Sequence, residues 1–245
     1  MVLKADHKAN ESQVVTMTNE VGKQPTTSGH WASLGRLAYD KALDIQMAQR
    51  HRLLNGEDDR QTIFAVEHPP TITIGKNGGA HNIVATKEWL EQSGFEVRTV
   101  DRGGDVTYHG PGQWVVYPVL HLHPWNNDVS KYIRLLEESI ITALAEVGIS
   151  GERSEGYPGV WVEDRKICAV GASVRRNQHG EFVTAHGLAL NVTTDLSDFQ
   201  TIVPCGIADR GVTSVEAEIN GNVTFSEWEG RLKRSFTNVF QLSFE

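Results

Sequence analysis

A cysteine between a proline and a glycine is a residue of this sequence that could carry covalent chemistry. Cys205 lies in the run Pro204-Cys205-Gly206, which disfavours a long helix and favours a loop. A thiol on a loop is accessible and can act as a nucleophile. Inert packing, the common role of a free cysteine, is the alternative interpretation.

A thiol nucleophile needs a neighbour that accepts its proton, because its ordinary pKa of about 8.5 leaves only a few per cent ionised near neutral pH. Three residues could do so: His109, His186 and Lys166. The second cysteine, Cys168, lies in an apolar run typical of a strand, and we predict that it is buried. Two cysteines in 245 residues do not form a disulfide framework.

A glycine-rich segment over residues 102–113, RGGDVTYHGPGQ, could bind a ligand. Its four glycines and one proline allow sharp turns and a close approach of the backbone. Arg102, Tyr108 and His109 add hydrogen-bond donors at the same place. The spacing fits neither a Walker loop nor a dinucleotide-binding loop, so no motif supports phosphate recognition. A tight surface connection is the alternative interpretation.

Two further pairs of residues could belong to other sites. His121 and His123 share one face of a predicted strand, a geometry compatible with zinc, but no third ligand stands nearby. We interpret them as surface residues and predict no metal and no cofactor. Arg175 and Arg176 are interpreted as a solvated strand end, with contact to an acidic partner protein as the alternative.

Composition limits the class of protein. With 39% hydrophobic and 22% charged residues, the chain has the balance of one globular domain. A net charge of -8 and a pI near 5.7 argue against a nucleic-acid binder, which needs clustered Lys and Arg. No secretory signal and no apolar run of about 18 residues occur, so we predict a cytoplasmic protein without a membrane span.

The elements that position these residues follow from the periodicity of the sequence. Residues 1–29 are polar and aperiodic, and we predict a disordered tail there, followed by one domain over residues 30–245. Predicted helices cover residues 39–54, 87–92 and 226–240, with a further helix between a cap at Asp128 or Ser130 and a stop at Gly148. Predicted strands cover residues 62–68, 71–74, 96–100, 114–122, 159–163, 166–176 and 182–192.

Two local features qualify these strands. Pro118 requires a sheet edge or a bulge, and Asp164-Arg165 is predicted to be a hairpin turn. The mixed order of helices and strands indicates an α+β (mixed α/β) single domain built on one sheet.

Four segments, in this order along the chain, resemble the lipoyl(octanoyl) transferases. They are residues 102–113, residues 159–171 (GVWVEDRKICAVG), residues 186–191 (HGLALN) and residues 204–206 (PCG). The resemblance extends from about Leu34 to the C-terminus. It implies the fold of the biotin and lipoate ligase catalytic domains, a mixed sheet flanked by helices. It also implies transfer of an octanoyl group to protein lysines without ATP, the first step of endogenous lipoate synthesis.

The same resemblance implies roles for residues and partners. Cys205 would form an acyl-thioester, with Lys166 as its proton partner. Octanoyl-acyl carrier protein would be the donor; lipoyl domains of 2-oxoacid dehydrogenase E2 subunits and the glycine cleavage H protein would be acceptors. Neither nucleic acid nor a membrane is expected as a partner. The residues implied to line the acyl pocket are Arg102, Gly103, Gly104, Asp105, Val106, Thr107, Tyr108, His109, Ala169, Val170, Gly171, Gly187, Leu188 and Ala189.

Two other classes stay open at this point. A lipoate-protein ligase would share the fold and a glycine-rich loop, but it activates the acid with ATP and needs no nucleophilic cysteine. A non-catalytic acyl-binding module would make the presence of both Cys205 and Lys166 a coincidence. Cys205 favours the transferase.

Overall fold

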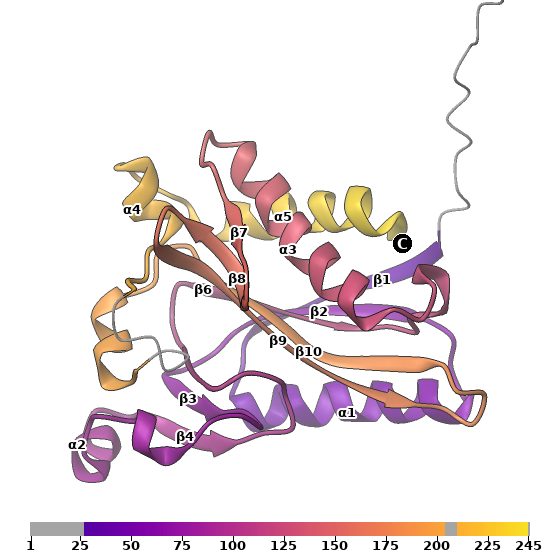
Figure 1. Cartoon of the computed structure of the whole chain (residues 1–245), viewed down its shortest axis with the longest axis horizontal. Helices are drawn as coiled ribbons and strands as arrows, with labels where there is room; N and C mark the ends of the chain where they lie inside the picture. The colour runs from indigo at the N-terminus through magenta and orange to yellow at the C-terminus, as the bar shows by residue number, and fades with distance from the viewer. Residues whose placement is uncertain (1–26, 204–209, 245) are drawn as a thin grey trace, which may run out of the picture.

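The computed structural model describes residues 27–203 and 210–244 (Figure 1). Cys205 therefore lies outside the described residues. The predicted tail overlaps the described part only at residues 27–29, which begin the first strand, β1 (Thr27–Arg36). This strand was not predicted, because its polar residues and its glycines mask the alternation of a strand.

Within the described residues, eight strands form a main sheet in the order β11-β1-β2-β6-β10-β9-β8-β7. Strand β1 pairs in parallel with β2 and β11, and all other neighbours are antiparallel. The bounds of the other strands are β2 Gln61–Glu67, β6 Gln113–Val119, β7 Glu152–Ser154, β8 Tyr157–Val162, β9 Arg165–Arg176, β10 Phe182–Asn191 and β11 Leu242–Phe244. A small second sheet has the order β4-β3-β5, with bounds β3 Thr71–Ile74, β4 Glu96–Thr99 and β5 Val106–His109.

Helices cover both faces of the main sheet (Figure 1). Helices α3 (Val129–Ala145) and α5 (Phe225–Phe240) pack on one face, and α1 (Tyr39–Asn55) packs on the other. The Asp128 side chain caps α3 by accepting a hydrogen bond from the Lys131 amide, as one of the two predicted caps. The shorter helices are η1 Ala80–Asn82, α2 Lys87–Gln92, η2 His123–Trp125, η3 Leu196–Thr201 and α4 Val215–Ile219.

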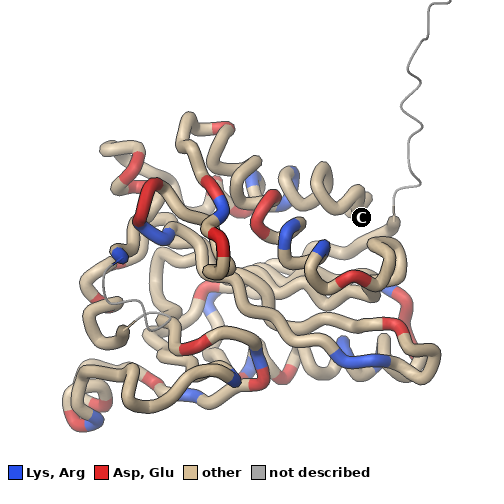
Figure 2. Tube along the Cα trace, in the orientation of Figure 1, with Lys and Arg blue, Asp and Glu red and all other residues tan. Residues whose placement is uncertain are grey.

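The alternation of side chains along the central strands separates two cores. In β6, Trp114 and Val116 face α3 and α5, whereas Val115 and Tyr117 face α1. Strands β6 and β10 carry no charged residue, and Figure 2 shows the charges on the surrounding turns and helices. A third apolar cluster lies against the small sheet and includes Tyr108.

The predicted helices and strands are confirmed, with two local corrections, but they form two sheets rather than the one sheet predicted, because β3, β4 and β5 pair among themselves. Pro118 does not lie in an edge strand, since β6 is inside the sheet. Its carbonyl accepts a hydrogen bond from Thr184 of β10, and the pairing of β6 with β10 ends at Val116, so the missing N–H removes no ladder bond. The hairpin turn lies at residues 163–164, one position earlier than predicted. In the described part of the chain, no helix has the length and apolarity needed to span a membrane.

Candidate active site

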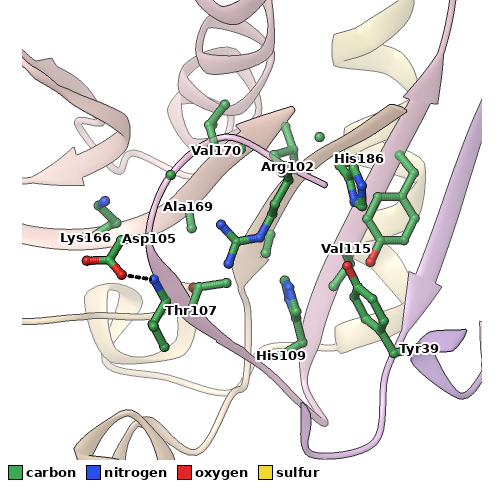
Figure 3. A pocket seen from close by; sticks show the side chains of 17 residues that line it. Tyr39, Arg102, Asp105, Thr107, His109, Val115, Lys166, Ala169, Val170 and His186 are labelled. Carbon is green, nitrogen blue, oxygen red and sulfur yellow. Dashed lines mark hydrogen bonds between the residues drawn. The ribbon is translucent and has the colours of Figure 1, made fainter. Parts of the chain in front are cut away.

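A cavity of about 480 Å³, counting its open mouth, lies over β9 and β10 on the same face of the sheet as α1 (Figure 3). Small residues form its floor, namely Ala169 and Gly171 of β9 and Gly187 and Ala189 of β10. Their lack of bulk leaves room for a ligand above the sheet.

The glycine-rich loop covers this floor because glycine occupies the points of closest approach. A Cβ atom on Gly171 would lie 2.8 Å from the Gly103 carbonyl oxygen, and the Gly103 amide donates to the Ala172 carbonyl at 2.9 Å. Gly104 has a φ of 83°, a conformation that side chains rarely adopt. Larger residues at these positions would push the loop off the sheet.

A β-bulge aims Lys166 at the cavity. The pairing of β8 with β9 shifts by one residue between Val160, opposite Cys168, and Trp161, opposite Lys166. Ile167 is the extra residue, and both Ile167 and Cys168 are buried in the core beneath α3 and α5. Without the bulge, strict alternation would place Lys166 on the core face with Cys168. The bulge instead places it on the cavity face with Ala169.

Lys166 is 8% exposed and lies where the cavity meets a second one of about 440 Å³. Its Nζ is 3.4 Å from the Pro158 carbonyl oxygen and 4.7 Å from the centre of the Trp161 ring. Its backbone accepts from the Thr213 amide at 3.0 Å and donates to the Gly211 carbonyl at 2.9 Å. The stretch of chain that follows the Cys205 segment is therefore bound alongside Lys166.

Aromatic and imidazole rings form the opposite end of the cavity. Figure 3 shows Tyr39, His109 and His186 there, with Arg102 between them and Lys166. The Tyr39 and His109 rings stack at 5.8 Å. Arg102 is buried and donates to the hydroxyl and carbonyl oxygens of Thr73.

Hydrogen bonds fix the orientation of two imidazole rings near this end, those of His68 and His109. His68 donates from Nδ1 to the Leu37 carbonyl at 2.7 Å, so its Nε2, 2.8 Å from the Tyr117 hydroxyl, accepts from that group. His109 Nδ1 lies 2.9 Å from Gln113 Oε1. Burial lowers the pKa of His109 to about 3 and those of His68 and His186 to about 4, so all three are neutral near pH 7.

The residues predicted to line the acyl pocket line this cavity, with the exception of Gly103 and Tyr108. Side chains alternate along β5, so Thr107 and His109 face the cavity while Tyr108 points into the third cluster. There its hydroxyl donates to Asp198 at 2.5 Å, and burial raises its pKa. Tyr108 therefore does not line this cavity. Gly103 lies beside the cavity, and its amide donates a hydrogen bond to the Ala172 carbonyl of β9.

Three lining residues, Tyr39, Val115 and Tyr117, were not predicted. Tyr39 comes from α1, far from every motif, and no local pattern marks it. The alternation along β6 places Val115 and Tyr117 on one face, but it does not say that a cavity lies over that face. Among the candidate proton acceptors, Lys166 lies beside residues 211–213, while His109 and His186 lie at the other end.

The remaining predicted groups lie away from the cavity. Cys168 is fully buried, as predicted, and burial raises the pKa of its thiol. His123 is exposed and lies 3.3 Å from Glu181, whereas His121 is partly buried. No group of three His, Cys, Asp or Glu side chains suited to a metal occurs among the described residues. Arg175 pairs with Asp101 at 3.0 Å.

Residues 38–237 match the family described as the lipoyl protein ligase A/B catalytic domain. A relative from Chloroflexus aggregans named octanoyltransferase is 46% identical over 211 residues, which cover 85% of this chain and 93% of the relative. Another of that name, from Parabacteroides distasonis, is 42% identical over 223 residues, which cover 87% of this chain and 99% of the relative.

Two solved structures have the same fold. One is lipoate-protein ligase A bound with ATP, with a TM-score of 0.69, 17% identity and coverage of 89% of this chain and 88% of that chain. The other is a bi-partite lipoate protein ligase from Thermoplasma acidophilum, with a TM-score of 0.68, 18% identity and coverage of 89% and 86%. They confirm the predicted mixed α/β ligase-type domain. The chain thus belongs to the lipoyl protein ligase A/B catalytic-domain family and, within it, to the octanoyltransferases, which are acyltransferases.

Proposed function

We propose that this octanoyltransferase takes the octanoyl group from an acyl carrier protein and passes it to a lysine of a lipoyl domain through a thioester on Cys205. One observation carries the proposal. Lys166 lines the cavity with the small-residue floor where that cavity meets a second one, and its backbone is hydrogen-bonded to Gly211 and Thr213 in the stretch that follows the Cys205 segment. An amine in this position could serve a thiol on that segment.

The first half-reaction is a thioester exchange. The Cys205 thiol passes its proton to Lys166 Nζ, and the thiolate attacks the carbonyl carbon of the donor thioester. A new carbon–sulfur bond forms on Cys205 and the carrier's carbon–sulfur bond breaks. The leaving carrier thiolate then recovers the proton from Lys166. One thioester replaces another, so the step needs no ATP.

The second half-reaction forms an amide. The neutral amine of the acceptor lysine attacks the Cys205 thioester, its carbon–nitrogen bond forms, and the Cys205 carbon–sulfur bond breaks. The proton lost by the amine returns to the Cys205 thiolate, with Lys166 as the relay. A thioester lies above an amide in free energy, which drives the transfer forward.

The acceptors belong to the same proposal. The Thermoplasma acidophilum ligase was solved in a study of that ligase and its E2 lipoyl domain. We extend this acceptor class to the present chain, with lipoyl domains of 2-oxoacid dehydrogenase E2 subunits and the glycine cleavage H protein as acceptors, in the cytoplasm.

Intact-protein mass spectrometry tests the proposal. Incubation with octanoyl-acyl carrier protein and no ATP should add one octanoyl group, and Cys205→Ser should abolish the adduct that the matched variant Cys168→Ala retains. Transfer that demands ATP and proceeds normally in Cys205→Ala would replace the transferase mechanism with that of a ligase.

A further inference from the structure

We infer that His186 is the end stop of the acyl channel and limits the length of the chain that the enzyme accepts. The inference rests on the proposed function, because it takes the reacting carbonyl to lie at the Lys166 end of the cavity. The tail of the acyl chain then points along the small-residue floor toward His186 (Figure 3).

The backbone of His186 is strained. His186 has a φ of 58° within strand β10, a left-handed conformation that is disfavoured for every residue with a side chain. A strained backbone conformation of this kind persists only where the surrounding structure enforces it, and such residues cluster at functional sites. The strained backbone holds a 2% exposed imidazole against the end of the cavity, where a glycine would relieve the strain and leave a space.

Residues of β6 and α1 contact His186. The Tyr117 ring lies perpendicular to the His186 ring at 6.4 Å, and the Tyr117 hydroxyl is bonded to His68. Behind His186, the Gln46 side chain from α1 accepts a hydrogen bond from the His186 amide at 3.0 Å. The end wall is therefore held in place from two sides, by the Tyr117 ring against the His186 ring and by Gln46 on the His186 backbone.

The length of the channel is similar to that of an octanoyl group. Ala189 pairs with Ala169 near Lys166, and His186 pairs with Ala172. Three residues of a strand span about 10 Å, which is similar to the length of an extended eight-carbon chain. An octanoyl group would fill the channel, and each further methylene would have to displace the His186 ring.

Donors that carry acyl groups of different length test the inference. Carrier proteins loaded with hexanoyl, octanoyl, decanoyl and dodecanoyl groups are supplied separately, and the rate of adduct formation on Cys205 is followed by intact mass. In His186→Gly, the ratio of the decanoyl rate to the octanoyl rate should rise about tenfold, the effect of burying two further methylenes. His186→Asn, which tolerates the left-handed backbone and is shorter, should shift the ratio less, in the same direction.

A matched control separates chain-length selection from relief of strain. Gln241, at the end of α5, has a φ of 55° and does not line the cavity, so Gln241→Gly should leave the ratio unchanged. An unchanged ratio in folded His186→Gly, or in His186→Asn should the glycine variant not fold, overturns the inference while octanoyl transfer stands. Absence of any octanoyl adduct in the wild type overturns the proposed function instead.

Discussion

The two ends of the cavity differ in how they are built. Lys166 lines the cavity, the second cavity beside it, and an open groove that contains Tyr157 and Ile133. The opposite end is closed by buried rings, among which His68 and His109 are held by hydrogen bonds and His186 packs against the Tyr117 ring. In the proposed mechanism the Lys166 end must admit two protein partners, one after the other. The His186 end must instead resist displacement, because it is proposed to limit the length of the acyl chain. Each end uses one irregularity of a strand, a bulge at Ile167 and a left-handed residue at His186.

Removal of the amine at the open end should have the largest effect. We expect Lys166→Ala to slow transfer by about 10²- to 10⁴-fold, the range of general acid–base catalysis. Lys166→Arg keeps the charge but cannot release a proton, so it should leave the thiol easily ionised and still transfer poorly. Thiol alkylation against pH and the transfer rate measure the two effects. Identical alkylation profiles in all three proteins would point to His109 or His186 instead.

Acid should destabilise the closed end. Below about pH 6.5 the histidines of the unfolded chain take up protons, whereas burial keeps His68 and His186 neutral down to about pH 4 and His109 down to about pH 3. The unfolded state therefore binds more protons in this window, and the free energy of unfolding falls as the pH drops from about 6.5 to 4. Each histidine contributes up to about 1.4 kcal/mol per pH unit.

Urea denaturation at several pH values measures this slope. His186→Gly lacks one of the three groups, so its unfolding free energy should depend less steeply on pH over the same window. An identical slope in wild type and variant would show that His186 is not held neutral by the fold.

A smaller effect is expected from the tyrosine that lies outside the cavity. Tyr108→Phe keeps the ring in the third cluster but removes the hydrogen bond to Asp198, and should lower the free energy of unfolding by about 1.5–3 kcal/mol. The chain-length preference should stay as in the wild type. A changed preference, measured with the same acyl carriers, would return Tyr108 to the acyl pocket.

The smallest effect is expected at the buried cysteine. Cys168→Ala should cost about 1 kcal/mol of stability, because it leaves a small void in the core, and should keep most of the transfer activity. Thermal unfolding and the transfer rate measure both quantities. A folded but inactive variant beside an active Cys205→Ala would reverse the assignment of the nucleophile.

Periodicity predicted most of the fold, because the long elements bury one regular face. Helix α3 repeats Leu136, Ile140 and Leu144 at steps of four, and these residues are buried as expected. The irregular positions could not be predicted from this periodicity. A bulge changes the face of every residue before it, so no count along the sequence could show that Lys166 and Ala169 share the cavity face. The family motifs, rather than the pattern, predicted that part of the site.

Strand β11 has a consequence beyond the site. Residues 242–244 pair in parallel with residues 27–29 of β1, and the Phe244 ring lies 5.6 Å from that of Trp31. These three residues thus cover the backbone edge of β1 over residues 27–29, which would otherwise offer unpaired amides and carbonyls to the strands of other molecules. A chain that stops after Phe240 would keep its cavity, but the exposed edge of β1 would favour self-association. The yield of monomeric protein should therefore fall although the residues of the cavity are unchanged.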